Sequence, residues 1–146
     1  MTDLAQSMIE YFEDLKLTAY KDTRGFWTIG YGHLLSQDHD WSGYAIDQAA
    51  ADAWLDQDMT EARADAAQFP HFSDMNDVRQ AVCVSMCFQM GTKPLSWPKF
   101  NEALKAQDYI TASKAGLDSE WAREETPERA SLEMAMLNSG VWELPT

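Results

Sequence analysis

Residues 13–35 read EDLKLTAYKDTRGFWTIGYGHLL, and this stretch decides the class of the fold. Its side chains alternate between two faces of the chain, with Trp27, Ile29 and Tyr31 on one face and Phe26, Thr28 and Gly30 on the other. Alternation with aromatic and β-branched residues is typical of strands, and the segment Asp22-Thr23-Arg24-Gly25 is typical of a turn. The stretch therefore predicts a β-hairpin.

Helical patterns flank the hairpin on both sides. Over residues 3–14, apolar side chains recur every three or four positions, which predicts an N-terminal helix. Residues 36–46 are polar and turn-like, and the alanine-rich segment 47–67 contains neither Pro nor Gly, so it predicts a long helix. A second long helix is predicted over residues 74–90. Its segment 81–88 is apolar on nearly every side, which is typical of a helix at the centre of a bundle.

Shorter helices are predicted over residues 98–106, 108–115 and 127–137. The last has Pro127 at its first position and Gly140 placed to end it. One hairpin followed by helices predicts the α+β class. We expect a single domain over residues 1–146, with a small β lobe at about 15–46, a connecting helix at about 47–67, and a helical lobe at about 70–146 that includes the helix 3–14.

The composition excludes several classes of partner. The 146 residues include 24 acidic and 11 basic side chains, which gives a net charge of −13. Such a surface repels phosphate backbones, so we expect no nucleic-acid partner. No apolar run approaches the roughly 18 residues of a membrane span, and the first residues show no secretory signal. We therefore expect neither membrane insertion nor export by a signal of its own.

Two cysteines, Cys83 and Cys87, lie four positions apart in an apolar segment. Helical spacing places them on one face as small hydrophobic side chains, and two thiols do not complete a zinc site. We expect them to pack in the core, and we expect no metal site.

Two acidic residues have unusual positions. Glu13 lies where the first helix gives way to the hairpin, and Asp22 lies in the hairpin turn, with Thr28 on the returning strand. Two carboxyls on facing walls of a cleft are what glycoside hydrolysis requires. Acids at helix ends and in turns are also common as caps, and Thr28 could simply bond to a neighbouring residue. The residues alone leave both interpretations open.

The same stretch closely resembles the active-site region of the phage-type lysozymes, glycoside hydrolase family 24. In that family a Glu is followed after eight residues by an Asp (or Cys), after five more by a Thr, and then by an Ile-Gly-x-Gly-His run. Glu13, Asp22, Thr28 and residues 29–33 meet this spacing. Later blocks at 78–91, at Trp121 and at 126–130 also resemble the family. The resemblance implies a lysozyme-like fold with a cleft between the two lobes.

The resemblance also implies catalytic roles. Glu13 matches the family's general acid, which must hold a proton near neutral pH in order to donate it to the glycosidic oxygen. Asp22 matches the second catalytic carboxylate, and Thr28 matches the hydroxyl that holds the attacking water. This arrangement implies inversion at the anomeric carbon.

Further residues match supporting and substrate-binding positions of the family. His33 and Asp58 match an ion pair, which we expect to stabilise the fold rather than act in catalysis. Arg129 matches a basic residue that faces the catalytic Glu, although an exposed Arg is the plainer interpretation. Sugar contacts are implied for Leu34, Phe88, Gln89 and Trp121, although aromatic residues on helices more often belong to the core.

Two features depart from the family pattern. The segment between His33 and Asp58 is shorter, which indicates that the small lobe has lost part of its loop. Many family members are basic, whereas residues 34–66 of this chain carry eight acids and one base. Three settings would accommodate this charge: an environment of high salt, a host wall with less anionic polymer, or attachment to a larger assembly.

The resemblance implies a muramidase that hydrolyses the β-1,4 bond between N-acetylmuramic acid and N-acetylglucosamine in peptidoglycan. It implies no cofactor, a monomer, and the glycan strand of peptidoglycan as partner. The expected setting is a phage endolysin held in the host cytoplasm until a holin releases it, or an enzyme carried in a virion. The alternative is a non-catalytic lysozyme-like module that binds glycan or belongs to a virion structure. The three matched residues speak against this alternative, and the acidic surface speaks mildly for it.

Overall fold

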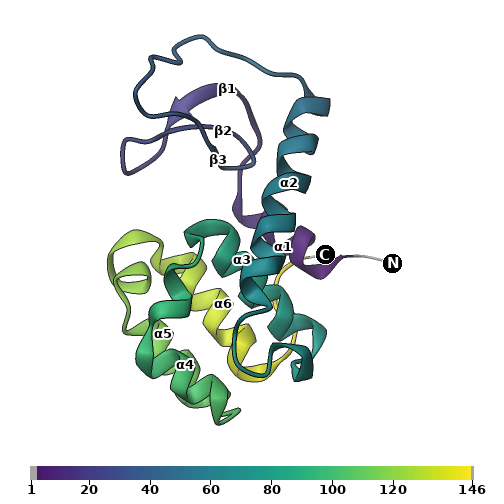
Figure 1. Ribbon diagram of the computed structural model, residues 1–146, viewed down its shortest axis with the longest axis vertical. Coiled ribbons are helices and arrows are strands. Elements are labelled where there is room, and N and C mark those ends of the chain that lie inside the picture. The colour runs from purple at the N-terminus through teal and green to yellow at the C-terminus, as the bar shows by residue number, and fades with distance from the viewer. Residues whose placement is uncertain (1–2, 146) are drawn as a thin grey trace.

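The strands lie in an upper lobe and most helices lie in a lower lobe, with α2 extending between the two (Figure 1). The computed structural model describes residues 3–145, so Met1, Thr2 and Thr146 of the expected domain lie outside the described residues. The helices are α1 (Leu4–Phe12), α2 (Gln48–Ala66), α3 (Asp77–Met90), α4 (Pro98–Lys105), α5 (Tyr109–Leu117) and α6 (Pro127–Ser139), and the strands are β1 (Lys16–Lys21), β2 (Trp27–Gly30) and β3 (His33–Leu34). The α+β class predicted from the sequence is confirmed.

The small lobe is a three-stranded antiparallel sheet in the order β1-β2-β3. Tyr20 pairs with Thr28 across the hairpin, and Ile29 pairs with His33. Asp22 closes the turn, because its N–H donates to the carbonyl of Phe26 at 2.8 Å. The hairpin was predicted, whereas the two-residue strand β3 was not.

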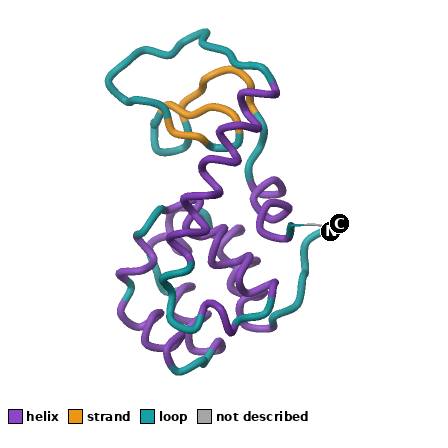
Figure 2. The backbone as a smooth tube through the Cα atoms, turned by 45° about the vertical axis from the view of Figure 1, so that its right-hand side comes forward, coloured by secondary structure: helices purple, strands orange, loops and turns teal. Residues whose placement is uncertain are grey.

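Helix α2 joins the two lobes, and Figure 2 shows it running from the sheet to the helical bundle. Asp47 caps its first turn, since the Asp47 carboxylate accepts the N–H of Ala50 at 2.8 Å. One face of the helix is buried throughout: Ala51, Leu55, Met59, Ala62 and Ala66. A continuous helix with a buried face on both lobes places the sheet at a defined distance from the bundle.

Helix α3 forms the centre of the helical lobe and packs against α1, α2 and α6. Its residues 81–87 are all buried. The expectation that Cys83 and Cys87 pack in the core is confirmed, since both are buried and free. Burial raises the pKa of both thiols, that of Cys87 to about 12, so they are neutral hydrophobic side chains.

Irregular turns account for the remaining differences from the predicted elements. The helix expected from residue 74 begins at Asp77, after a 3₁₀ turn at Phe72–Asp74. A π-helical turn, Trp121–Glu125, precedes α6 and was not predicted. Among residues 3–145, no helix is both long enough and apolar enough to cross a membrane.

Arg79 satisfies the last carbonyls of α6. Its Nε donates to the carbonyl of Leu137 and its Nη2 to that of Asn138, both at 2.7 Å. Its guanidinium also lies over the Tyr109 ring, 4.2 Å from the ring centroid. One side chain on α3 therefore holds the C-terminus of α6 and the start of α5.

We predict that Arg79→Ala lowers the free energy of unfolding by about 1–2 kcal/mol, because two carbonyls lose a charged donor. This corresponds to a fall in Tm of about 3–6 °C, measured by circular dichroism. Arg123→Ala is the control, because Arg123 is exposed in the π-helical turn. Equal melting temperatures for the two variants would contradict the capping role.

Candidate active site

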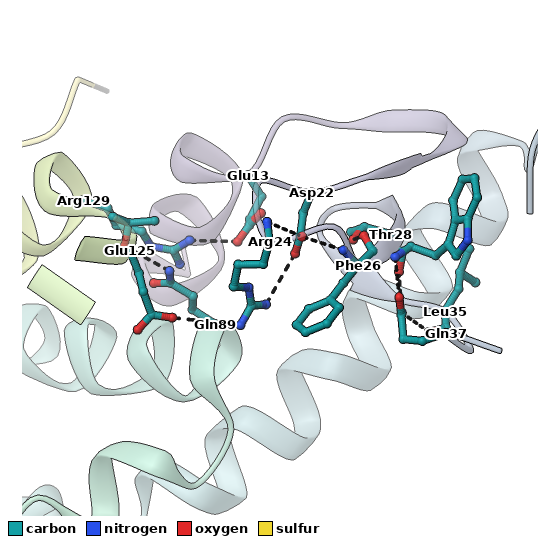
Figure 3. A network of polar contacts seen from close by, with 12 residues as sticks. Glu13, Asp22, Arg24, Phe26, Thr28, Leu35, Gln37, Gln89, Glu125 and Arg129 are labelled. Atoms are coloured by element: carbon teal, nitrogen blue, oxygen red, sulfur yellow. Dashed lines mark hydrogen bonds and ion pairs between the residues drawn. The ribbon is translucent and has the colours of Figure 1, made fainter. Parts of the chain in front are cut away.

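A cavity of about 1590 Å³ lies between the two lobes. Its walls come from the end of α1, the hairpin, α2, α3, the π-helical turn and α6. Glu13, Asp22 and Thr28 all line it, and Figure 3 shows the three side chains from close by. The structure thus brings the three predicted catalytic residues to one cavity.

Glu13 lies at the boundary between α1 and β1. Its N–H still donates to the carbonyl of Ile9 at 2.8 Å, but its backbone is extended, so the helix ends at Phe12. Its side chain is 20% exposed, and its Oε1 accepts Arg129 Nη1 at 2.8 Å. The contact that the resemblance implied between Arg129 and Glu13 is confirmed.

Gly32 makes room for the Glu13 carboxyl. A Cβ at this position would lie 2.6 Å from Glu13 Oε2 and 2.9 Å from its carboxyl carbon. The residue also has φ of +77°, which glycine adopts without strain. The second Gly of the Ile-Gly-x-Gly-His run is therefore required by the position of Glu13, a role that sequence reasoning missed.

Arg129 is the centre of a buried polar network. Besides Glu13, its Nε donates to Glu133 Oε2 at 3.0 Å and its Nη2 to Ser85 Oγ at 3.0 Å. Its guanidinium also lies over the Phe12 ring, 4.9 Å from the ring centroid. Arg129 is only 8% exposed, so the interpretation as an exposed Arg is wrong. Ser85 and Glu133 were not predicted as part of the site.

Asp22 is oriented by the backbone of its own turn. Its Oδ1 accepts the N–H groups of Arg24 and Phe26, each at 2.9 Å. Its Oδ2 faces the Arg24 guanidinium, with 3.4 Å to Nη2. The capping interpretation is therefore correct for one oxygen, and the second oxygen is held by a side chain alone.

Thr28 is 3% exposed, yet it lines the cavity. Its hydroxyl donates to the carbonyl of Phe26 at 2.9 Å, which is the bond to a neighbour that the plainer interpretation expects. Because the hydroxyl proton is committed to that carbonyl, the lone pairs of Oγ1 remain available to accept a hydrogen bond. Thr28 Oγ1 can therefore still accept a hydrogen bond.

Arg24 reaches across the cavity from the hairpin to the helical lobe. Its Nη1 lies 4.0 Å from Glu125 Oε1 in the π-helical turn. Lys93 approaches the other oxygen of Glu125, at 3.6 Å. The two lobes are thus linked by charges that lie partly in solvent, and such contacts weaken as salt rises.

His33 and Asp58 form the expected pair, with 2.7 Å between His33 Nδ1 and Asp58 Oδ2. The His33 ring also stacks on Trp54, with ring centroids 4.3 Å apart and 17° between the ring planes. Asp58 and Trp54 both belong to α2, and His33 belongs to β3. The pair therefore fixes the sheet to the connecting helix.

Three of the four expected sugar-contact residues line the cavity: Leu34, Phe88 and Gln89. Trp121 does not line it, because its ring is fully buried and packs beside Trp97. Its expected sugar contact is therefore wrong. Trp121 contacts one of the lining residues instead, since its Nε1 donates to Gln89 Oε1 at 2.9 Å. Gln89 Nε2 in turn donates to Thr126 Oγ1 at 3.1 Å, so both ends of the amide are held.

Comparison with known proteins is consistent with this geometry. A model of the family described as phage lysozyme matches residues 10–133. The chain belongs to the phage lysozyme family. "Probable T4-type lysozyme 1" of Dictyostelium discoideum is 23% identical over 96% of this chain and 96% of its own. The "Endolysin" of Acyrthosiphon pisum secondary endosymbiont phage 1 is 31% identical over 73% of this chain and 70% of its own.

A third relative is a virion component by name. "Pre-baseplate central spike protein Gp5" of Enterobacteria phage T4 is 30% identical over 85% of this chain, which corresponds to 26% of that protein. Membership of the phage lysozyme family supports a lysozyme-type function, which makes the protein a hydrolase with peptidoglycan as its substrate class. The resemblance stated from the sequence is confirmed.

We predict that Gly32→Ala lowers lysozyme activity at least about tenfold, because the new methyl group displaces the Glu13 carboxyl. The matched control is Gly43→Ala. Gly43 has φ of +81° and no atom within 4 Å of a built Cβ, so this variant carries the backbone strain without the clash. Activity on purified peptidoglycan, normalised to folded protein, distinguishes the two variants. A similar loss in both would mean that strain, not displacement of Glu13, limits activity.

We predict that His33→Asn lowers Tm by about 3–8 °C, because the contact with Asp58 and the stacking on Trp54 are lost. Specific activity below the transition should stay within about twofold of the parent, because among residues 3–145 no side-chain hydrogen bond or ion pair joins His33 to Glu13, Asp22 or Thr28. Thermal unfolding and a turnover assay at 20 °C check both parts. Complete loss of turnover in folded protein would overturn the structural role.

Proposed function

We propose that the protein is an inverting muramidase that cleaves the β-1,4 bond between N-acetylmuramic acid and N-acetylglucosamine. The observation that carries the proposal is that Glu13, Asp22 and Thr28 line one cavity between the lobes. The family assignment supports the substrate class.

In this mechanism Glu13 is the general acid. Its carboxyl is partly buried and held at Oε1 by Arg129, which leaves Oε2 to carry the proton. Proton donation to the glycosidic oxygen allows the leaving sugar to depart as an alcohol while positive charge develops on the other ring. A fixed carboxyl donates along a defined direction, and such orientation is a large part of catalytic rate.

Asp22 and Thr28 hold the attacking water on the opposite face of the sugar. The water donates one hydrogen to Thr28 Oγ1, whose own proton is engaged by the carbonyl of Phe26. It donates the other to Asp22 Oδ2, which acts as general base. An inverting glycosidase needs about 6.5–9.5 Å between its two carboxyl groups, because the attacking water must fit between them. Attack by this water inverts the configuration at the anomeric carbon.

Leu34, Phe88 and Gln89 bind the glycan in this proposal. Leu34 is 54% exposed and offers apolar surface at the sheet edge. Gln89 offers amide groups that are already held by Trp121 and Thr126, so they lose little freedom when sugar binds.

The biological setting that we propose is lysis of a bacterial cell by a phage. The relative named endolysin supports a free enzyme, and the relative named as a spike protein supports a virion-borne one. A non-catalytic glycan-binding or virion module is the competing function, and the turnover experiment separates the two.

We predict that Glu13→Gln reduces the release of reducing ends from purified peptidoglycan at least about 1000-fold while binding to the same material persists. Glu10→Gln is the control, because Glu10 is an exposed acid on the same helix. Proton NMR of the first product formed should detect the α anomer. No turnover by a folded parent at any salt would favour the binding module, and undiminished turnover in Glu13→Gln would exclude Glu13 as the general acid. A β anomer would exclude inversion.

A further inference from the structure

Glu133 has no part in the mechanism above, although it lies close to it. It belongs to α6, one helical turn after Arg129, and its side chain is 0% exposed. Its Oε2 accepts Arg129 Nε at 3.0 Å. Among residues 3–145, its Oε1 has no hydrogen-bond partner. A buried carboxyl with one unsatisfied oxygen is rare enough to require an explanation.

Stability does not supply that explanation. Burial of a carboxyl is costly, and an apolar side chain of similar size commonly fills such a position as well or better. Cys83, a buried member of the hydrophobic core, lies near Glu133 and could pack against an apolar residue at this position. The distinctive property of Glu133 is therefore its charge, and the charge within hydrogen-bond reach is Arg129.

Arg129 makes conflicting contributions to Glu13. Its hydrogen bond to Oε1 orients the carboxyl, which favours catalysis. Its positive charge, however, favours the ionised carboxylate and so opposes the proton that a general acid must hold. An orienting group with no net charge would avoid this conflict.

We propose that Glu133 is a positioning residue: a buried counter-charge that neutralises Arg129, so that Arg129 orients the Glu13 carboxyl without drawing away its proton. The proposal rests on the proposed function, in which Glu13 is the general acid. Glu13 and Glu133 occupy different nitrogens of one guanidinium, Nη1 and Nε, and Ser85 takes the third. The guanidinium is therefore shared between a reactive carboxyl and a buried, unreactive one.

Burial raises the pKa of the Glu133 carboxyl, and the charge of Arg129 offsets only part of that rise. The proposal requires that the carboxyl be ionised when Arg129 is present. A neutral Glu133 would leave the full positive charge beside Glu13.

The other titratable groups that face this triad do not replace Glu133. Cys83 approaches from α3 and Tyr20 from β1, and burial raises the pKa of both, so both are neutral at working pH. Asp14 and Asp22 face the site from the chain next to Glu13 and from the hairpin turn. Arg24, Lys16 and the π-turn acids Glu124 and Glu125 also line the cavity, and all of these lie nearer to solvent. Their charges are screened more strongly than that of Glu133.

The test compares the pH dependence of kcat/KM for the parent and Glu133→Gln. Activity requires protonated Glu13, so it falls as pH rises through the alkaline limb. Without the counter-charge, Arg129 favours ionised Glu13, and the limb should move to lower pH by about one unit. Glu128→Gln is the matched control on the same helix, because Glu128 is exposed, and its limb should move by less than about 0.3 unit.

If folded Glu133→Gln has the same alkaline limb as the parent, the proposal is overturned. Loss of a purely structural Glu133 would lower stability but would not move this limb. If this variant does not fold, carboxyl ¹³C NMR of the parent decides the question. An ionised Glu133 signal throughout pH 5–8 supports the counter-charge, and a protonated one overturns it. Failure of the proposed function looks different, since the parent would then show no turnover or would match Glu13→Gln.

Discussion

The contact on which the rest of the structure depends is the buried guanidinium of Arg129. It bonds to Glu13 at the end of α1, to Ser85 on α3 and to Glu133 on α6, and its flat face covers the Phe12 ring. Because Glu13 is also the first residue beyond α1, this one side chain fixes the point where the helical lobe passes into the sheet. A buried cation must have its donors satisfied, so packing of three helices and orientation of the carboxyl are set together.

Much of the fold could be predicted because its signals are local. Alternation in residues 26–31 marks the strand, the Asp22 turn marks the hairpin, and the uninterrupted helical pattern of α2 and α3 marks the bundle. Strand β3 and the π-helical turn were missed because neither has a local signal. Two residues make no periodic pattern, and β3 is a strand only because His33 and Leu34 pair with β2. The π-helical turn begins at the buried Trp121, and that burial is a tertiary property.

The residues of the candidate site also divide into those with a local sequence signal and those without one. Glu13, at the end of α1, and Asp22 and Thr28, in the hairpin that follows, lie in one continuous segment, so their spacing is a local property. Trp121 was misjudged because an aromatic residue on a helical turn has the same pattern whether its ring faces the core or the cavity. Glu133 was missed because one acid among 24 in a chain of this charge is most simply a surface residue. Only the position of Arg129 in the folded protein distinguishes Glu133 from the other acidic residues.

The acidic residues of the chain act in two separate ways, one at the exposed surface and one inside the core. Exposed acids of α2, such as Glu61, which lines the cavity, repel an anionic cell wall, and salt screens that repulsion over about 8–10 Å. Glu133 is fully buried, so mobile ions do not reach it and its effect on Arg129 persists in salt. In the proposed mechanism, substrate capture therefore depends on the surface and on ionic strength, whereas the proton on Glu13 depends on a charge balance inside the core. A strongly negative lysozyme can in this way accommodate a changed surface without altering the environment of its acid.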